Sequence, residues 1–271
     1  MENRYSRFLM PVIALILSGA GMMVKDPGWS GNLFAAALGV VVSFLISTLG
    51  WGLENRKKIW TVIKAHFIWN LRISCSYLYR IKVGDHYLLI KSRKHGKFQP
   101  VGGNFKRNRY SHDGLRKLEI KEDNKFSSVK HDDDDLRVFV RGYKLPLFLK
   151  WYNSPNKKRE VCYDREFYEE LIKPGFLPSK TFGYPVIDFI KQVITPVRYS
   201  KYLQCFEVHI YDIVELNPNR EQLEALKELK YKGDSDILKW CKAETIRCQG
   251  YKSEKQTSDF EITDHSVEII N

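Results

Sequence analysis

Three glutamates in the second half of the chain have the type and spacing to bind a metal ion. Glu166, Glu169 and Glu170 are i, i+3 and i+4, so a helix here would place the three carboxylates on one face. Clustered carboxylates repel one another unless a hard cation such as Mg²⁺, or basic neighbours, neutralise them. The pattern predicts a Mg²⁺ site, and the alternative is a solvated acidic helix face paired to lysines.

A second candidate site lies upstream, where a strand pattern leads into two glycines. Residues 73–81 and 86–91 are rich in β-branched and aromatic residues and are separated by a Gly-Asp turn, so we expect a β-hairpin. A basic stretch and then Gly102 and Gly103 follow the second strand. Because paired glycines let the backbone approach a ligand closely, we predict that Gly102 and Gly103 bind a ligand.

These two features resemble parts of a Nudix domain and occur in the same order. LLIKSRKHGKFQPVGG resembles the opening of the domain, and REFYEEL, which begins at Arg165, resembles the R-E-U-x-E-E core of the Nudix box, where U is apolar. The resemblance implies an α+β fold, a Nudix-like α/β/α sandwich with a mixed sheet, over residues 72–271. It also implies that the three glutamates bind the Mg²⁺ that activates water, and we add Arg165 to the predicted ligand-binding residues.

The chain departs from the full box, which reads G-x5-E-x7-R-E-U-x-E-E-x-G-U. Trp151 stands at the first glycine position and Lys157 at the first glutamate position. These losses favour a degenerate domain that binds its nucleotide without cleaving it. In the alternative, a hydrolase, Glu169 and Glu170 are the catalytic residues.

A polar insertion, residues 104–135, separates the glycines from the box and is expected to form a loop or a partly ordered lobe. It ends in HDDDD at 131–135, which is either a cation site or, as we favour, a solvated charge run. Strands are expected at 136–140 and 203–214, a buried helix or a strand at 186–197, an apolar core segment at 145–152, and a closing strand around Trp240.

Two apolar segments without charges open the chain, at about 8–24 and 33–53. Each is long enough to cross a bilayer core of ~30 Å, and a short Pro/Gly turn joins them. We therefore predict a two-helix transmembrane hairpin over residues 1–53.

The flanking charges predict the orientation of this hairpin. Arg4 and Arg7 precede the first segment and residues 56–58 (RKK) follow the second, so both ends and the domain are expected on the cytoplasmic side of the inner membrane. The alternative, a cleaved signal peptide, leaves the domain on the same side. Residues 54–71 read as an amphipathic juxtamembrane helix or as a plain first helix of the domain.

The net charge of +12 suits attraction to anionic lipid headgroups or to a phosphate-bearing ligand. A DNA or RNA partner is not expected, because the chain carries no helix-turn-helix, zinc-finger or ribonucleoprotein motif. The five cysteines form no C-x-x-C pair, which argues against a disulfide framework and against a zinc site.

Hairpin and domain together resemble the two-transmembrane, SMODS-associated Nudix effectors of cyclic-oligonucleotide-based anti-phage signalling systems (CBASS). The resemblance rests on the two spans, Pro100 to Gly103, Asp135 to Arg137, Arg159-Glu160 and the box core. It implies a homo-oligomeric receptor for a cyclic oligonucleotide made by a partner nucleotidyltransferase (CD-NTase), which then disrupts the inner membrane. The alternatives are a membrane-anchored, Mg-dependent Nudix hydrolase of nucleoside diphosphate derivatives and a membrane scaffold without a small ligand.

Overall fold

A computed structural model describes most of the chain beyond residue 54 and little before it. The chain divides into two compact units, 1–60 and 61–271. The predicted span at 8–24 and most of that at 33–53 lie outside the described residues. No helix in the described part is both long and apolar enough to cross a bilayer. The described residues are 38–42, 50, 52–53, 55–107, 115–116, 118–123, 135–154, 160, 162–251 and 259–270.

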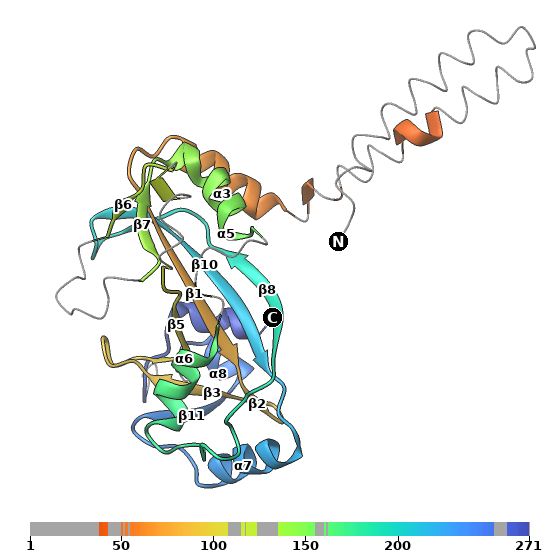
Figure 1. The fold of residues 1–271 in the computed structure, drawn as a ribbon, viewed down its shortest axis with the longest axis vertical. Coiled ribbons are helices and arrows are strands. Elements are labelled where there is room, and N and C mark those ends of the chain that lie inside the picture. The colour runs from red at the N-terminus through yellow and green to blue at the C-terminus, as the bar shows by residue number, and fades with distance from the viewer. Residues whose placement is uncertain are drawn as a thin grey trace, which may run out of the picture. The chain divides into compact units, whose positions relative to one another are not determined.

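The larger sheet is organised around β1, which is buried over almost its whole length and has partners on both edges. β10 runs beside it in parallel (Figure 1). The other edge is shared by two antiparallel strands, β7 against the first half of β1 and β5 against the second half. The strands are β1 (Leu71–Arg80), β5 (Gly102–Asn104), β6 (Lys121–Glu122), β7 (Arg137–Val140), β8 (Ile187–Ile194), β9 (Arg198–Ser200) and β10 (Cys205–Leu216).

The smaller sheet shows that the predicted hairpin of 73–81 with 86–91 is wrong in its first arm. The segment 73–81 enters the larger sheet as β1, and only the short β2 pairs with β3, with Lys82 opposite Tyr87. Gly84, with φ of 64°, makes the turn between them. The first arm was lost because β10, β7 and β5 occupy both edges of β1. The strands are β2 (Lys82–Val83), β3 (His86–Lys91), β4 (Phe98–Gln99) and β11 (Leu238–Lys242).

The mixed α+β fold predicted from the sequence is confirmed, with helices against both sheets. The helix expected at 54–71 ends at His66, where the Gly142 N–H donates to the Ile68 carbonyl, 2.8 Å away, and fixes the chain before β1. Added Cβ atoms at Gly142 would overlap the Ala65 carbonyl, so this corner needs glycine. The helices are α3 (Arg56–His66), η3 (Gly142–Lys144), α5 (Leu145–Tyr152), α6 (Asp164–Phe167), η4 (Tyr168–Ile172), α7 (Arg220–Tyr231), α8 (Ala243–Arg247) and η5 (Asp264–Ile269).

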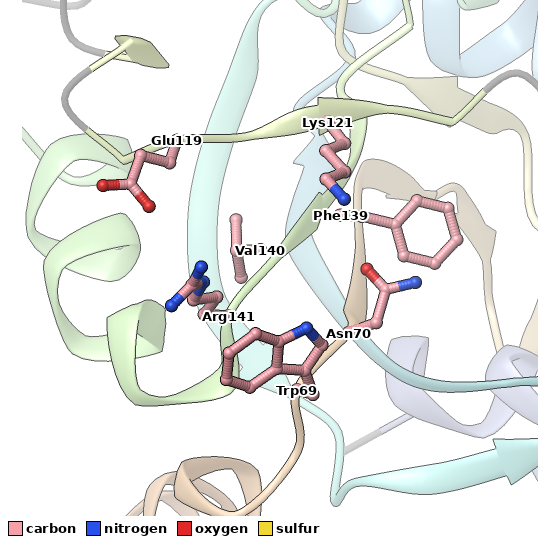
Figure 2. Close-up of a pocket in the computed structure, with 7 residues that line it drawn as sticks. All are labelled: Trp69, Asn70, Glu119, Lys121, Phe139, Val140 and Arg141. Atoms are coloured by element: carbon pink, nitrogen blue, oxygen red, sulfur yellow. The ribbon is translucent and has the colours of Figure 1, made fainter.

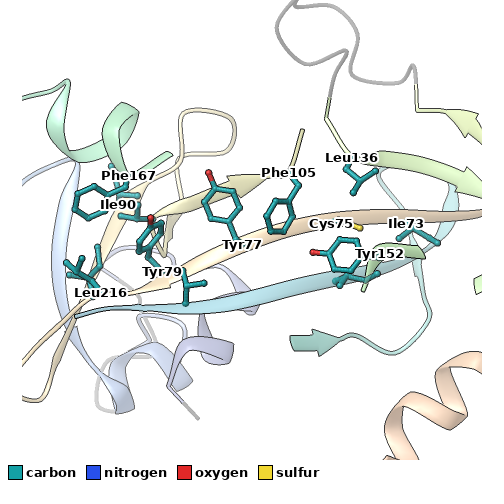
Figure 3. Close-up of a cluster of buried hydrophobic side chains, with 14 of the residues drawn as sticks. Ile73, Cys75, Tyr77, Tyr79, Ile90, Phe105, Leu136, Tyr152, Phe167 and Leu216 are labelled. Carbon is teal, nitrogen blue, oxygen red and sulfur yellow. The ribbon is translucent and has the colours of Figure 1, made fainter. Parts of the chain in front are cut away.

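Buried aromatic rings connect β1 to the acidic helix. Figure 3 shows Tyr79 projecting from β1 toward Phe167 of α6, and the two ring centroids lie 5.4 Å apart. The Tyr79 hydroxyl donates to the Tyr163 carbonyl at 3.0 Å, and Tyr77 packs on Phe105 at 5.0 Å. Buried aromatic pairs add specific geometry to apolar burial. This packing fixes α6 over β1 and so positions the glutamates that follow.

Candidate functional site

The predicted acidic helix is present, but its second half is not a regular α-helix. It begins as α6 and widens at Tyr168 into a π-helical turn, in which the Lys173 N–H donates to the Tyr168 carbonyl at 2.8 Å. Turns of this kind occur frequently at functional sites. Glu166 and Glu170 face β5, whereas Glu169 is exposed, so only two of the three glutamates turn toward the glycine pair.

Gly102 and Gly103 do allow a close backbone approach, and in the structure the approaching groups belong to the protein. A Cβ atom at Gly102, where φ is 151°, would collide with the Tyr77 carbonyl oxygen of β1. A Cβ atom at Gly103 would collide with the Glu166 carboxylate. The Gly102 N–H donates to Glu170 Oε2 at 3.1 Å. The glycines therefore let the box core pack directly on β5.

Arg165 connects the acidic helix to the start of the insertion. Its guanidinium contacts the Glu166 carboxylate, donates to the Asn104 carbonyl at 2.8 Å and donates to Glu160 Oε1 at 3.3 Å. Glu160 also accepts from the Lys106 N–H at 2.7 Å. The sequence predicted Arg165 as a ligand-binding residue. It assigned no role to Asn104 or to Glu160, which hold Arg165 in place.

Asp135 is not part of a solvated charge run, contrary to the prediction for 131–135. Its side chain is 8% exposed and lies 2.6 Å from both Lys106 Nζ and Arg137 Nη2. It also accepts from Asn104 Nδ2 at 3.2 Å. The reason is its place directly before β7, where it is bridged to Lys106 at the edge of the larger sheet. Residues 131–134 lie outside the described part of the chain.

The surroundings of the two inward glutamates make their charged forms costly. Burial raises the pKa of Glu170 to about 8, and the charge of Glu166 adds to the increase while the Gly102 N–H opposes it. Burial also raises the pKa of Glu166, against the effect of the Arg165 guanidinium. Buried carboxylates of this kind can exchange protons near neutral pH or gain free energy from a cation.

The site offers the type of ligand that Mg²⁺ prefers, but the protein alone offers few such ligands. Carboxylate oxygens are the ligands that Mg²⁺ prefers, and this ion usually takes one or two of them together with water and substrate phosphates. Among the described residues, no group of three or more His, Cys, Asp or Glu side chains is placed to hold a metal ion. Glu166 and Glu170 therefore fit Mg²⁺ only if a phosphate-bearing ligand supplies further oxygens.

The first half of the Nudix box is replaced by a core helix. Trp151 lies on α5 and packs on Phe148, with ring centroids 5.4 Å apart. Lys157 lies outside the described residues. An indole and an ammonium group thus stand where the box has a flexible glycine and a carboxylate. The carboxylate that the box has at position 157 is therefore replaced by a lysine.

The comparisons with known proteins agree with this geometry. The family model of the SMODS-associated NUDIX domain matches residues 70–270, a range that contains both sheets, the glycine pair and the box core. No curated protein matches the chain. Since the match covers well over half of the 271 residues, the chain belongs to the SMODS-associated NUDIX domain family.

Proposed function

We propose that the chain is a membrane effector of a bacterial CBASS anti-phage system whose cytoplasmic Nudix domain binds a cyclic oligonucleotide without cleaving it. The observation that carries the proposal is the asymmetry of the box. The second half of the box, with Arg165 and Glu170, is retained and packs on β5. In the first half, Trp151 and Lys157 stand at the positions of the glycine and the glutamate. Membership of the SMODS-associated family supports a functional link to a CD-NTase that makes the ligand.

The ligand is expected to lie along β5 and the box core. A phosphodiester would meet the backbone of Gly102 and Gly103 and the guanidinium of Arg165. Mg²⁺ would be held by Glu166 and Glu170, with the ligand phosphates and water as further ligands. Because Arg165 already bonds to Glu160 and Asn104, ligand binding would rearrange these contacts. The rearrangement would affect the insertion, which begins at Asn104.

The step from ligand binding to the membrane rests on the first 53 residues. The uncharged segments 8–24 and 33–53 are proposed as inner-membrane spans, with the N-terminus and the domain in the cytoplasm. Ligand-driven homo-oligomers would gather the hairpins, whose small residues allow close helix packing. Pore formation or disruption of the membrane would then lead to abortive infection.

A membrane-anchored, Mg-dependent Nudix hydrolase is the second candidate, and one observation favours it. The pKa of Glu170 is raised to about 8, within the range in which a carboxylate can act as a base near neutral pH. Glu169 and Glu170 would then act on a nucleoside diphosphate derivative. The absence of a carboxylate at Lys157 weighs against this candidate.

The melting temperature of the full chain in a non-ionic detergent tests both candidates. Cyclic di- and trinucleotides are added one at a time with Mg²⁺, and a ligand at a hundred times its Kd should stabilise the folded state by about 2.7 kcal/mol. A rise with one cyclic nucleotide, accompanied by a larger oligomer in light scattering, supports the receptor. Mg-dependent turnover of a nucleoside diphosphate derivative that Glu169→Gln abolishes and Glu228→Gln preserves would replace it with the hydrolase.

A further inference from the structure

A pocket of about 260 Å³ lies at the opposite end of β1 from the glycine pair. Its floor is formed by Phe139 and Val140 of β7, both buried. Trp69 and Asn70, which directly precede β1, line one side of it (Figure 2). Gly103 pairs with Tyr77, seven residues along β1 from Asn70, so ~23 Å separates the pocket from the box core.

Two cations line this pocket, Arg141 and Lys121. Lys144 lowers the pKa of the Glu119 carboxyl group, and Glu119 is close enough to Arg141 for the guanidinium to lower that pKa further. Within the described ranges, neither Arg141 nor Lys121 forms a side-chain hydrogen bond or an ion pair, and the Asn70 amide forms no hydrogen bond. The one carboxylate in the lining, Glu119, is paired with Lys144 at 3.0 Å. The lining therefore presents two positive charges and an amide in a hollow, which is an arrangement suited to an anion.

Trp69 adds an aromatic surface to these charges. Its ring lies under the Arg141 guanidinium, whose carbon is 4.2 Å from the ring centroid, as Figure 2 shows. This contact holds the guanidinium at the pocket through a cation–π interaction. The side chain of Trp69 nevertheless remains 74% exposed, so most of the indole surface is available to a ligand.

We infer that this pocket is a second ligand site, which binds a phosphate group attached to an apolar or aromatic moiety. Arg141 would contact the phosphate through its planar N–H edge, and Lys121 would add a second positive charge. Trp69 would pack on the moiety beside the phosphate. Both a nucleotide and the headgroup region of an anionic phospholipid have this chemistry. The inference does not rest on the function proposed for the box core.

Binding to the full chain in a non-ionic detergent tests the inference. The probes are inorganic phosphate, cyclic di-AMP and dihexanoyl phosphatidylglycerol, with dihexanoyl phosphatidylcholine as the zwitterionic comparison, and the readout is isothermal titration calorimetry. Lys121→Gln and Arg141→Gln should each weaken binding of a phosphate-bearing probe about tenfold, which corresponds to about 1.4 kcal/mol. The exposed Lys180, on a distant loop, provides the control Lys180→Gln.

The source of the phosphate follows from which probe responds. Tightest binding of phosphatidylglycerol assigns the site to a lipid. Binding of cyclic di-AMP assigns it to a nucleotide only where Lys121→Gln weakens that binding and Gly103→Ala does not, because the box core is itself proposed to bind a cyclic nucleotide. Lys121→Gln carries most weight because this side chain is exposed and its loss leaves the fold intact. The inference is wrong if no anionic probe binds, or if the pocket variants and Lys180→Gln bind equally. Gly103→Ala, which alters the box core, should leave binding at the pocket unchanged.

Discussion

Glu170 accepts a hydrogen bond from the backbone N–H of Gly102, at 3.1 Å, across sixty-eight residues of sequence. The bond joins the retained half of the Nudix box to the strand that carries the glycine pair. Burial of the carboxylate raises the pKa of Glu170 to about 8, and the bond from the Gly102 N–H opposes this increase. Ligand binding, proton affinity and backbone geometry are therefore coupled at this one contact.

The glycine pair gives two substitutions with different outcomes. Gly103→Ala would push the Glu166 side chain aside, so we expect the cyclic-nucleotide thermal shift to disappear while the melting temperature of the free protein changes little. Gly102→Ala would place a Cβ atom against the Tyr77 carbonyl in a backbone conformation that favours glycine, and should destabilise the fold by about 2 kcal/mol. Thermal melting with and without ligand separates the two.

Gly183→Ala is the matched control, because a Cβ atom there has only ordinary contacts. If Gly103→Ala retained the full thermal shift, Glu166 would have no part in the ligand site.

The buried Glu170 predicts a loss of stability as the pH rises. The unfolded chain releases this proton near pH 4.5, whereas the folded protein holds it up to about pH 8, so the free energy of unfolding should fall between these values. Glu170→Gln removes this dependence. The melting temperature of the variant should therefore rise relative to that of the wild type as the pH increases from 5 to 8. If the melting temperatures of the wild type and of Glu170→Gln changed equally with pH over this range, the raised pKa of Glu170 would be contradicted. The exposed Glu169→Gln is the comparison.

Asp135 should behave as a structural ion-pair partner. Asp135→Asn leaves Arg137, which is 7% exposed, with a neutral partner, and we expect the folded state to lose about 3 kcal/mol. Denaturant unfolding of the full chain measures this loss. Asp236→Asn, at an exposed position, should change the free energy of unfolding by a few tenths of a kcal/mol. Equal effects of the two substitutions would mean that the Asp135 network adds nothing.

Glu207 predicts the opposite effect of pH, a loss of stability at acidic pH. Burial alone would raise the pKa of Glu207, but His209, Arg72 and Arg198 lower it to about 2. Its contribution is therefore present above pH 4.5 and is lost as the pH falls toward 2. Glu207→Gln should destabilise the protein at pH 7, and the difference from the wild type should shrink below pH 4.5 and disappear near pH 2. An unchanged melting temperature at pH 7 would rule this out, with Glu228→Gln as the exposed control.

Local patterns in the sequence were enough to find several elements and the retained box core. The strand expected at 203–214 is β10 (Cys205–Leu216), and that at 136–140 is β7 (Arg137–Val140). The segment 186–197, for which helix and strand were both left open, contains β8 (Ile187–Ile194). The expected core segment is helix α5 (Leu145–Tyr152). Each of these elements is identified by the pattern of apolar and polar residues within a short window of the sequence.

The sequence by itself determined the family resemblance, the departures at Trp151 and Lys157, and the uncharged segments before residue 54, because each is a property of neighbours along the chain. Only the tertiary structure decided that β1 joins the larger sheet, that Asp135 is buried, and that Glu166 and Glu170 face the glycines while Glu169 does not. Strand pairing and burial depend on contacts between segments tens of residues apart, such as Gly102 with Glu170, and no local periodicity specifies which segments will meet.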